Sequence, residues 1–293
     1  MKKLIIIAVI VLLIIGTGYF LLAPVSATAA VLYVERGQVE VNSGSGWQIG
    51  TDEMELSKGS QVKTGDGEAT VVLLEGEVVH LEPNSEIKLD QISGKKIHIT
   101  QLAGETWNKV TKISGISEFT IETPTTVATV RGTEFILNEE ELDVSEGEVD
   151  YGLKAGEKIK VMGGKRALAK MLREENIPEE RLARIRNFPE KYEKILKRVR
   201  AREIRKHEQI LRMAEKRGFT EEKIRAQLNE IDEGRQDEEK AYEQVPALMK
   251  PKAKRTYLLT KEIKRARMKL RDRLITERDA MRELETQRDI ANQ

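Results

Sequence analysis

The sequence predicts a multidomain protein with an N-terminal transmembrane helix, an all-β domain of short strands arranged as a sandwich or roll, and an all-α helical bundle with coiled-coil character. Three observations predict this order. Residues 4–22 form an uncharged apolar run, residues 31–164 hold 17 of the 21 glycines, and residues 165–293 are rich in helix-forming side chains. The expected domains are therefore residues 1–30, 31–164 and 165–293.

The net charge of +1 is divided unevenly along the chain. Residues 31–164 contain 24 acidic and 12 basic side chains, a net charge of −12, whereas residues 165–293 contain 25 acidic and 36 basic side chains, a net charge of +11. Because opposite charges attract, we expect the two parts to dock, either within one chain or head to tail between chains. The chain has no cysteine, which excludes disulfides and thiolate chemistry.

The first part, residues 1–30, has the features of a signal anchor. As a helix, its apolar run at residues 4–22 would be about 28 Å long, close to the thickness of the hydrocarbon core of a bilayer. Lys2 and Lys3 precede the run, and the next basic residue is Arg36. The positive-inside rule therefore predicts a single pass through the cytoplasmic (or inner) membrane, with the N-terminus inside and the bulk of the chain extracytoplasmic.

A cleaved signal peptide is the alternative interpretation of the same residues, since Ala27-Thr28-Ala29 resembles a cleavage site. The body of the protein is exported in both cases. Only three residues precede the apolar run, so no cytoplasmic domain is expected there.

The second part has the period-two pattern of β-strands. Short runs of alternating apolar and polar residues recur every 8–12 residues, and turn residues separate them. This pattern is typical of a sandwich, barrel or roll built from short strands. The expected strands include residues 70–74, 77–81, 86–89, 97–102 and 119–123, and the turns include Gly65-Asp66-Gly67, Glu75-Gly76, Pro83-Asn84 and Ser93-Gly94.

One stretch, TVATVRGTEF at residues 126–135, places a glycine between two opposite charges in a strand-like run. The apolar residues change phase before Phe135, which a β-bulge at Gly132 would explain, because glycine tolerates the backbone of a bulge. Arg131 and Glu134 are expected to pair across this bulge. A ligand site at Arg131, a good bidentate donor to anions, is the alternative.

The stretches SKGSQVKTGDGEATVVLLEGEVVHLEPNSEIKL (residues 57–89) and FTIETPTTVATVRGTEF (residues 119–135) resemble the FecR domain family. The first resembles its Gly-Asp turn, alternating strand and L-x-P-x-S-x-I pattern, and the second its signature TP-x-x-x-x-x-V-R-G-T-x-F. VSEGEV at residues 144–149 and LKAGE at residues 153–157 are similar to its closing motifs. The signature residues, expected to be structural, are Thr123, Pro124, Arg131, Gly132, Thr133, Glu134 and Phe135.

The resemblance covers about residues 31–162 and implies an exported all-β domain without catalytic residues. In the best-known members of the family it implies a sensor that passes a signal across the inner membrane to a sigma factor. Those members have a cytoplasmic segment before the membrane helix, where this sequence has Met1-Lys2-Lys3. The resemblance therefore predicts the domain, and a sigma-factor role remains an alternative.

The residues indicate no enzyme, no cofactor and no metal site. Residues 152–158 lack the spacing of a phosphate-binding loop, and Gly44-Ser45-Gly46 lacks the G-x-S-x-G of a nucleophile elbow. His80 and His98 would form a site only if they met across strands, and ordinary strand positions are expected instead. The acidic cluster at residues 139–150 lacks the alternating acids of a calcium loop, so a solvated turn and strand edge are expected there.

The third part is expected to be helical. Pro178 and Pro189 suit the first turns of helices, Gly218 suits a helix end, and a last helix is expected from about Lys252 nearly to the end of the chain. Apolar residues of this last helix lie close to heptad spacing, which predicts a coiled-coil seam within the chain or in a homo-oligomer. The first helical stripe comprises Tyr192, Ile195, Leu196 and Val199 and later Ile210, Leu211 and Ala214. The seam comprises Leu259, Ile263, Ala266, Leu270, Leu274, Met281 and Leu284.

The stretch KPKAKRTYLLTKEIKRARMKLRDR at residues 250–273 is strongly basic, as in helices that bind nucleic acid. In an exported protein, nucleic acid is not the expected partner. Anionic lipid head groups, an acidic envelope polymer or the acidic β domain of the chain itself are the expected partners. A solvated, Arg/Lys-rich helix face with Glu pairs is the simpler interpretation, and the sequence favours it over a binding patch.

The sequence therefore predicts a membrane-anchored, exported FecR-domain protein that acts in binding, scaffolding or sensing at the cell envelope, without catalysis. Its expected partners are the membrane and a protein or envelope polymer. A transmembrane regulator of the sigma-factor type and a helical protein that binds nucleic acid or an anionic polymer are the alternatives.

Overall fold

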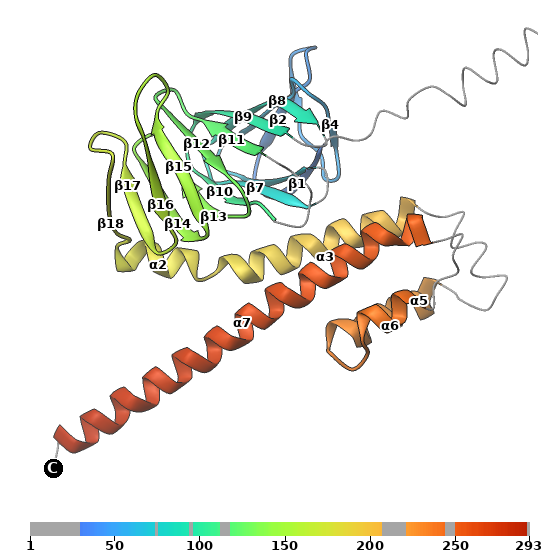
Figure 1. The fold of residues 1–293 in the computed structure, drawn as a ribbon. Helices are drawn as coiled ribbons and strands as arrows, with labels where there is room; N and C mark the ends of the chain where they lie inside the picture. Colours follow the sequence, from blue (N-terminus) through green and yellow to red (C-terminus); the bar gives the residue numbers. More distant parts are fainter. Residues whose placement is uncertain are drawn as a thin grey trace, which may run out of the picture.

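The computed structural model describes residues 30–73, 76–93, 96–111, 118–206, 221–243 and 250–291. These residues form a β-sandwich with a layer of helices along one side (Figure 1). The predicted transmembrane helix and the alternative cleavage site lie outside the described residues. None of the helices that are described combines the length and the apolar character that crossing a bilayer requires.

Two nine-stranded sheets make up the sandwich. Sheet A is ordered β18 (Arg173–Asn176), β17 (Lys165–Leu168), β14 (Glu141–Glu146), β13 (Glu134–Leu137), β10 (Thr106–Lys109), β7 (Glu77–Leu81), β6 (Glu68–Leu73), β1 (Ala30–Arg36) and β4 (Glu55–Leu56). Sheet B is ordered β16 (Lys158–Met162), β15 (Glu148–Leu153), β12 (Thr126–Val130), β11 (Glu118–Glu122), β9 (Lys96–Ala103), β8 (Glu86–Ser93), β5 (Gln61–Thr64), β2 (Val39–Asn42) and β3 (Trp47–Ile49).

The chain passes back and forth between the two sheets. From β6 onward, the hairpins β6–β7, β13–β14 and β17–β18 lie in sheet A, and the hairpins β8–β9, β11–β12 and β15–β16 lie in sheet B. The pairs in these sheets are antiparallel except β9 with β11, which is parallel. The alternating strands predicted at residues 70–74, 77–81, 86–89, 97–102 and 119–123 correspond to β6, β7, β8, β9 and β11.

Aliphatic side chains from the inner faces of both sheets form the main core. Alternation is clear in sheet B, where every second residue is buried in the first half of β8, in β9 up to Gln101 and in β11. Large side chains of this core include Leu89, Ile99 and Phe119 from sheet B and Phe135 from sheet A. This core is what the period-two pattern predicts.

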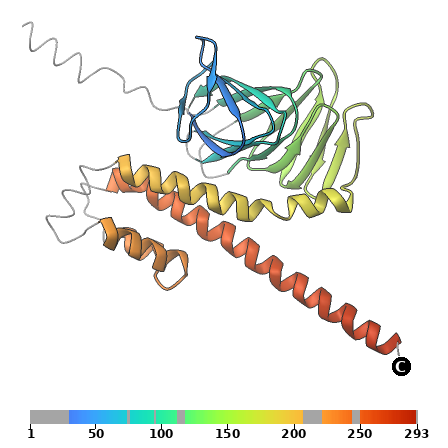
Figure 2. The ribbon, with the colours of Figure 1, turned by 180° about the vertical axis from the view of Figure 1, so that it is seen from behind.

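Sheet A is different, because its central strands are buried on both faces. Every residue of β7, and every residue of β6 after Glu68, is buried or nearly so. The outward residues of sheet A form a second apolar cluster with the helices, and helix α3 lies across it (Figures 1 and 2). The strand members of this cluster are Val31, Tyr33, Val72, Val78, Trp107 and Ile136.

The helix layer is built mainly from two long helices that pack against each other. Helix α3 follows the short helix α2, and α7 runs back along α3 before it extends beyond the sandwich to the C-terminal end (Figure 2). The first part of the predicted apolar stripe, at residues 192–199, lies on the buried side of α3, and its later part at residues 210–214 lies outside the described residues. The described helices are α2 (Glu179–Ile185), α3 (Phe188–Lys206), α5 (Glu221–Asp232), α6 (Glu238–Glu243) and α7 (Lys250–Ala291).

The predicted fold class is wrong in its C-terminal part. A separate helical bundle with coiled-coil character is not formed by the described residues, because the stripe of α3 packs on sheet A. Of the predicted seam of α7, Leu259, Ile263 and Ala266 are buried, and they lie in the same apolar cluster as α3 and sheet A. An apolar helix face packs on the largest apolar surface within reach, and here that surface is a sheet.

The division of the chain at residue 164 stays a prediction. Strands β17 and β18 lie on the C-terminal side of that boundary and continue sheet A through antiparallel pairs with β14 and with each other. The helices then begin after Pro178, with Glu179 and Glu180 in the first turn of α2, where acidic side chains favour the helix dipole.

Candidate functional site

The signature residues lie at two turns of the sandwich. Thr123 is buried in the turn between β11 and β12, where its hydroxyl accepts the backbone N–H of Thr126 at 2.9 Å and lies 2.7 Å from the Thr126 hydroxyl. Pro124 is exposed in the same turn. These contacts close the turn.

Arg131, Gly132 and Thr133 carry the chain from sheet B to sheet A. Gly132 has a φ of 73°, a left-handed conformation that favours glycine. The buried Thr133 hydroxyl donates to the carbonyl of Glu148 at 3.0 Å. The apolar residues change phase mainly because β12 and β13 belong to different sheets, and a register shift between Glu134 and Phe135 adds a bulge.

Glu134 pairs with a lysine of a neighbouring strand, and the expected Arg131–Glu134 pair is not formed within the described residues. The Nζ of Lys109 lies 2.8 Å from a Glu134 carboxylate oxygen and 3.0 Å from Glu146. Lys269 of α7 also pairs with Glu146. Burial raises the pKa of Glu146, but hydrogen bonds and charge from Lys269 and Lys109 outweigh burial and lower this pKa to about 2. The signature turn is thus connected to the helix layer.

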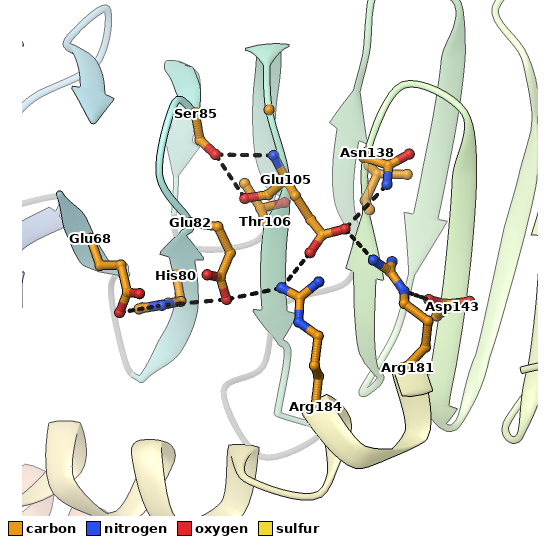
Figure 3. Close-up of polar contacts among 12 residues, drawn as sticks. Glu68, His80, Glu82, Ser85, Glu105, Thr106, Asn138, Asp143, Arg181 and Arg184 are labelled. Atoms are coloured by element: carbon orange, nitrogen blue, oxygen red, sulfur yellow. Dashed lines mark hydrogen bonds and ion pairs between the residues drawn. The ribbon is translucent and has the colours of Figure 1, made fainter. Parts of the chain in front are cut away.

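His80 on β7 lies under α3 and is 3% exposed (Figure 3). Its Nδ1 is 3.0 Å from the Thr70 hydroxyl, and its Nε2 is 3.8 Å from Glu68, 3.9 Å from Glu82 and 3.5 Å from the Nζ of Lys191. Burial, followed by the charge of Lys191, lowers the pKa of His80 to about 4. The imidazole is therefore neutral at pH 7.

Arg181 of α2 reaches into a group of carboxylates at the edge of the same face (Figure 3). Its guanidinium donates to Glu105 at 2.6 Å and to the fully buried Asp143 at 2.8 Å, and it lies 3.1 Å from Glu141. Arg166 of β17 binds Asp143 from the sheet side at 2.6 Å. Burial lowers the pKa of Arg181, but the carboxylate hydrogen bonds outweigh burial and raise it, so the side chain stays charged.

Arg184 continues this network along the helix layer. Its guanidinium lies 2.6 Å from Glu105 and 3.4 Å from Glu82, the carboxylate that also faces His80. Buried hydroxyls hold the backbone around these acids, since the Ser85 hydroxyl donates to the Glu105 carbonyl at 2.9 Å. The His80 group and the Arg181 group therefore form one connected polar surface under α2 and the start of α3.

Three arginines hold the other end of α3 to the β domain. Arg198 contacts Glu35 at 2.9 Å and Asp52 at 2.5 Å, and its guanidinium lies 4.8 Å from the centre of the Tyr33 ring. Arg202 contacts Glu55 at 2.6 Å, and Arg205 pairs with Glu53. The spacing of 198, 202 and 205 places these arginines on one helix face. The predicted docking of the acidic part with the basic part is confirmed within the chain.

An aromatic cluster lies between these two polar groups. The ring of Trp107 on β10 stacks on Phe188 of α3, with centroids 4.6 Å apart, and meets Tyr192 edge-on at 6.2 Å. Such pairs are worth about 0.5–1.5 kcal/mol beyond the area that they bury. The site is therefore an interface, apolar at its centre and charged around its rim, and we call it the helix–sheet interface.

The charged groups of this interface are engaged with one another. Its carboxylates are paired with guanidinium and ammonium groups, and the described residues contain no group of three or more His, Cys, Asp or Glu side chains placed to hold a metal ion. His80 and His98 lie in different sheets. The acidic cluster at residues 139–150 is divided among separate cations, for example Lys160 with Glu148.

The motifs in the sequence point to the signature turn, whereas the helix–sheet interface lies elsewhere. Two signals in the sequence indicate the helix–sheet interface. The arginines at 198, 202 and 205 recur on one face of a helix. The runs at residues 68–73 and 77–81 are nearly continuous in apolar residues, which is typical of strands covered on both faces.

The FecR family, described as "FecR protein", matches residues 60–151. Two crystal structures of a candidate anti-sigma factor from Parabacteroides distasonis ATCC 8503 are similar to the chain at 16% sequence identity and a TM-score of 0.35. The similarity covers 40% of this chain and 59% of that protein, so it spans less than two thirds of its length. At this TM-score the likeness supports no conclusion about function. No curated protein matches the chain.

Proposed function

We propose that this chain, whose residues 60–151 form a FecR domain, is a non-catalytic regulator that acts in signalling by binding another protein. The family match carries this proposal, because the FecR family is a regulatory and non-enzymatic family. The interface described above supports it, since its polar groups are arranged for recognition of charged and aromatic side chains.

The finer proposal is that the regulated partner is a sigma factor or a protein that transmits a signal to one. The test is to purify the tagged full-length chain from its host after chemical cross-linking, and to compare transcripts with and without the gene. We expect a sigma factor or a signal-transducing protein among the cross-linked partners, together with altered transcription of a defined set of genes. Unchanged transcripts and the absence of such a partner would contradict the proposal.

Association with a membrane is the localisation that the FecR family supports, and we propose it for this chain on that basis. Exposure of the chain on the extracytoplasmic side is the finer proposal. Protease added to intact cells is expected to degrade the helix layer, and full protection from protease would contradict this location.

Binding of nucleic acid is a weaker alternative, because basic side chains of α7 are already paired within the chain. Lys264 contacts Glu238 at 2.6 Å, Arg267 contacts Glu193 at 2.7 Å, and Lys269 pairs with Glu146 of the sandwich. Phosphate contacts would have to replace these pairs. A strong, salt-dependent shift of a DNA or RNA probe by the full chain would favour the alternative.

A further inference from the structure

The helix–sheet interface differs in composition from the core of the sandwich. Between the sheets, 3 of 28 buried cluster residues are aromatic, whereas 4 of 14 are aromatic at the interface. The four are Tyr33, Trp107, Phe188 and Tyr192, and arginines surround them. Tryptophan, tyrosine and arginine are the residues that dominate the energy of protein–protein interfaces. The contact of α3 with sheet A therefore has the composition of a binding interface.

The fit of α3 to this face is also incomplete. The hydroxyls of Tyr33 and Tyr192 and the indole N–H of Trp107 are buried, yet they have no hydrogen-bond partner among the described residues. An unpaired buried group of this kind costs about 1–3 kcal/mol, and the Tyr151 hydroxyl between the sheets is also without a partner among the described residues. Three such groups lie at this one contact, and two of them, Tyr33 and Trp107, belong to the sheet face.

Without the basic side chains of α2 and α3, the rim of the outer face of sheet A is strongly acidic. Six basic side chains of α2 and α3 neutralise it, and within the strands Arg36 and Arg166 neutralise Glu68 and Asp143 in part. The rim carboxylates are Glu35, Asp52, Glu53, Glu55, Glu68, Glu82, Glu105, Glu141 and Asp143, and their helix partners are Arg181, Arg184, Lys191, Arg198, Arg202 and Arg205.

We propose that the outer face of sheet A is a helix-binding surface, that α3 is its exchangeable occupant, and that a partner protein binds by placing a cationic amphipathic helix there. The acidic rim and the aromatic centre define the partner chemistry. The helix of the partner protein carries an apolar stripe that covers Trp107 and Tyr33. Beside this stripe it carries arginines with the same spacing as Arg198, Arg202 and Arg205 of α3. This inference rests on the proposed function and names the surface through which that function is exerted.

A labelled peptide of the α3 sequence, residues 188–206, serves as the probe for the full-length chain. Arg198→Glu in the chain removes the cis contacts with Glu35 and Asp52 and leaves the sheet surface unchanged. We expect this variant to bind the peptide at least about tenfold more tightly than the wild-type chain at low salt, because its own α3 competes less well. Fluorescence anisotropy measures the affinity.

Lys194→Glu is the matched control, because Lys194 is an exposed residue of the same helix and undergoes the same charge reversal. We expect its affinity for the peptide to equal that of the wild-type chain. A peptide with Arg198, Arg202 and Arg205 all replaced by glutamate should not bind any of the chains.

Hydrogen exchange distinguishes exchange of the helix from loss of the fold. In Arg198→Glu, the amides of α3 should exchange faster while those of β6 and β7 stay protected. If β6 and β7 lose protection in Arg198→Glu, the same measurement is made on the milder variant Arg202→Ala. The proposal is overturned if all chains bind the peptide equally. It is also overturned if no chain binds the peptide while the amides of β6 and β7 stay protected. A sigma factor still captured by the full chain would then leave the proposed function standing.

Discussion

At the scale of single residues, buried hydroxyls fix the corners where the chain changes direction. Thr133 donates to the Glu148 carbonyl, and Thr123 closes its turn through Thr126. At another corner the Thr64 hydroxyl accepts the N–H of Ser85 at 2.9 Å. A corner exposes backbone groups that a straight strand would pair, and a short hydroxyl side chain can satisfy them locally. The family signature therefore specifies turns.

Gly132→Val tests the most constrained of these corners. Gly132 has a φ of 73°, and a β-branched side chain is strained in that conformation. We expect the variant to lose about 1–3 kcal/mol of stability, which corresponds to a melting temperature lower by several degrees. Thermal unfolding measures the change.

Gly65→Ala is the control for this substitution, because a Cβ at Gly65 would meet its nearest neighbour, the Gln38 carbonyl, only at 4.0 Å. Its melting temperature should stay close to that of the wild-type chain. An unchanged melting temperature for Gly132→Val would contradict the role of this corner.

His80 makes stability dependent on pH. Burial lowers its pKa from 6.5 to about 4, so between these pH values the unfolded chain binds a proton that the folded chain does not bind. Stability should therefore fall as the pH decreases from about 6.5 towards 4, by on the order of 3 kcal/mol in total from this group. Denaturant unfolding across this range measures the slope.

His80→Asn removes the titrating group while keeping a side chain that can bond to Thr70. We expect it to flatten the pH dependence between pH 6.5 and 4, whatever its effect on stability at pH 7. His98→Asn, at a more exposed position on sheet B, provides the comparison and should keep the wild-type slope. A His80→Asn slope equal to that of the wild type would exclude His80 as the cause.

At the scale of elements, α3 is the centre of the helix layer. One side of it contacts sheet A, and another side contacts α5 and α7 through a buried ion pair. In that pair the guanidinium of Arg200 donates to both carboxylate oxygens of Asp232, at 2.8 and 2.6 Å, and to the hydroxyl of Thr260 at 3.2 Å. Both charged side chains are less than a tenth exposed, so each buried charge is stabilised mainly by its partner and little by water.

Asp232→Ala leaves the Arg200 charge buried without its carboxylate, so we expect a loss of about 3–5 kcal/mol. Replacing both partners, Arg200→Met with Asp232→Leu, removes both charges and should recover most of this loss. Denaturant unfolding of the two variants and the wild type measures the difference. A loss in Asp232→Ala below about 1 kcal/mol would show that the pair is solvated, as at a protein surface.

The strands show which signals in the sequence were sufficient. Period-two alternation predicted β8, β9 and β11, because each has one buried face and one exposed face. The same reasoning missed the helix cover on β6 and β7, although their continuous apolar residues indicate burial on both faces. Helical periodicity predicted α3 and α7, but the partner of an apolar stripe is a tertiary property.

At the scale of the whole molecule, the acidic part (residues 31–164) and the basic part (residues 165–293) are joined by specific ion pairs. These pairs lie mainly at the rim of the helix–sheet interface, where several side chains remain partly exposed, such as Arg184, Lys191 and Arg205. Partly exposed pairs are screened by salt, whereas the aliphatic core between the sheets is not. The two layers should therefore respond differently to ionic strength.

Raising the NaCl concentration from about 0.05 M to about 1 M should accelerate amide exchange in α2 and α3 by several fold and leave the strands of the central core unchanged. Hydrogen exchange followed by mass spectrometry measures both layers in one experiment. Uniform behaviour of helices and strands would contradict a separate, electrostatically held helix layer.

The sequence by itself determined an all-β part built from short strands, its resemblance to the FecR domain family, and the attraction between an acidic part and a basic part. These properties depend on local periodicity, on glycine and hydroxyl side chains at turns, and on net charge, which are all read along the chain. Tertiary structure alone decided that α3 covers sheet A, that Glu134 pairs with Lys109, and that His80 is buried beneath Lys191. The physical reason is that a helix stripe or a charge has many complementary partners in the sequence, and only packing in three dimensions selects one.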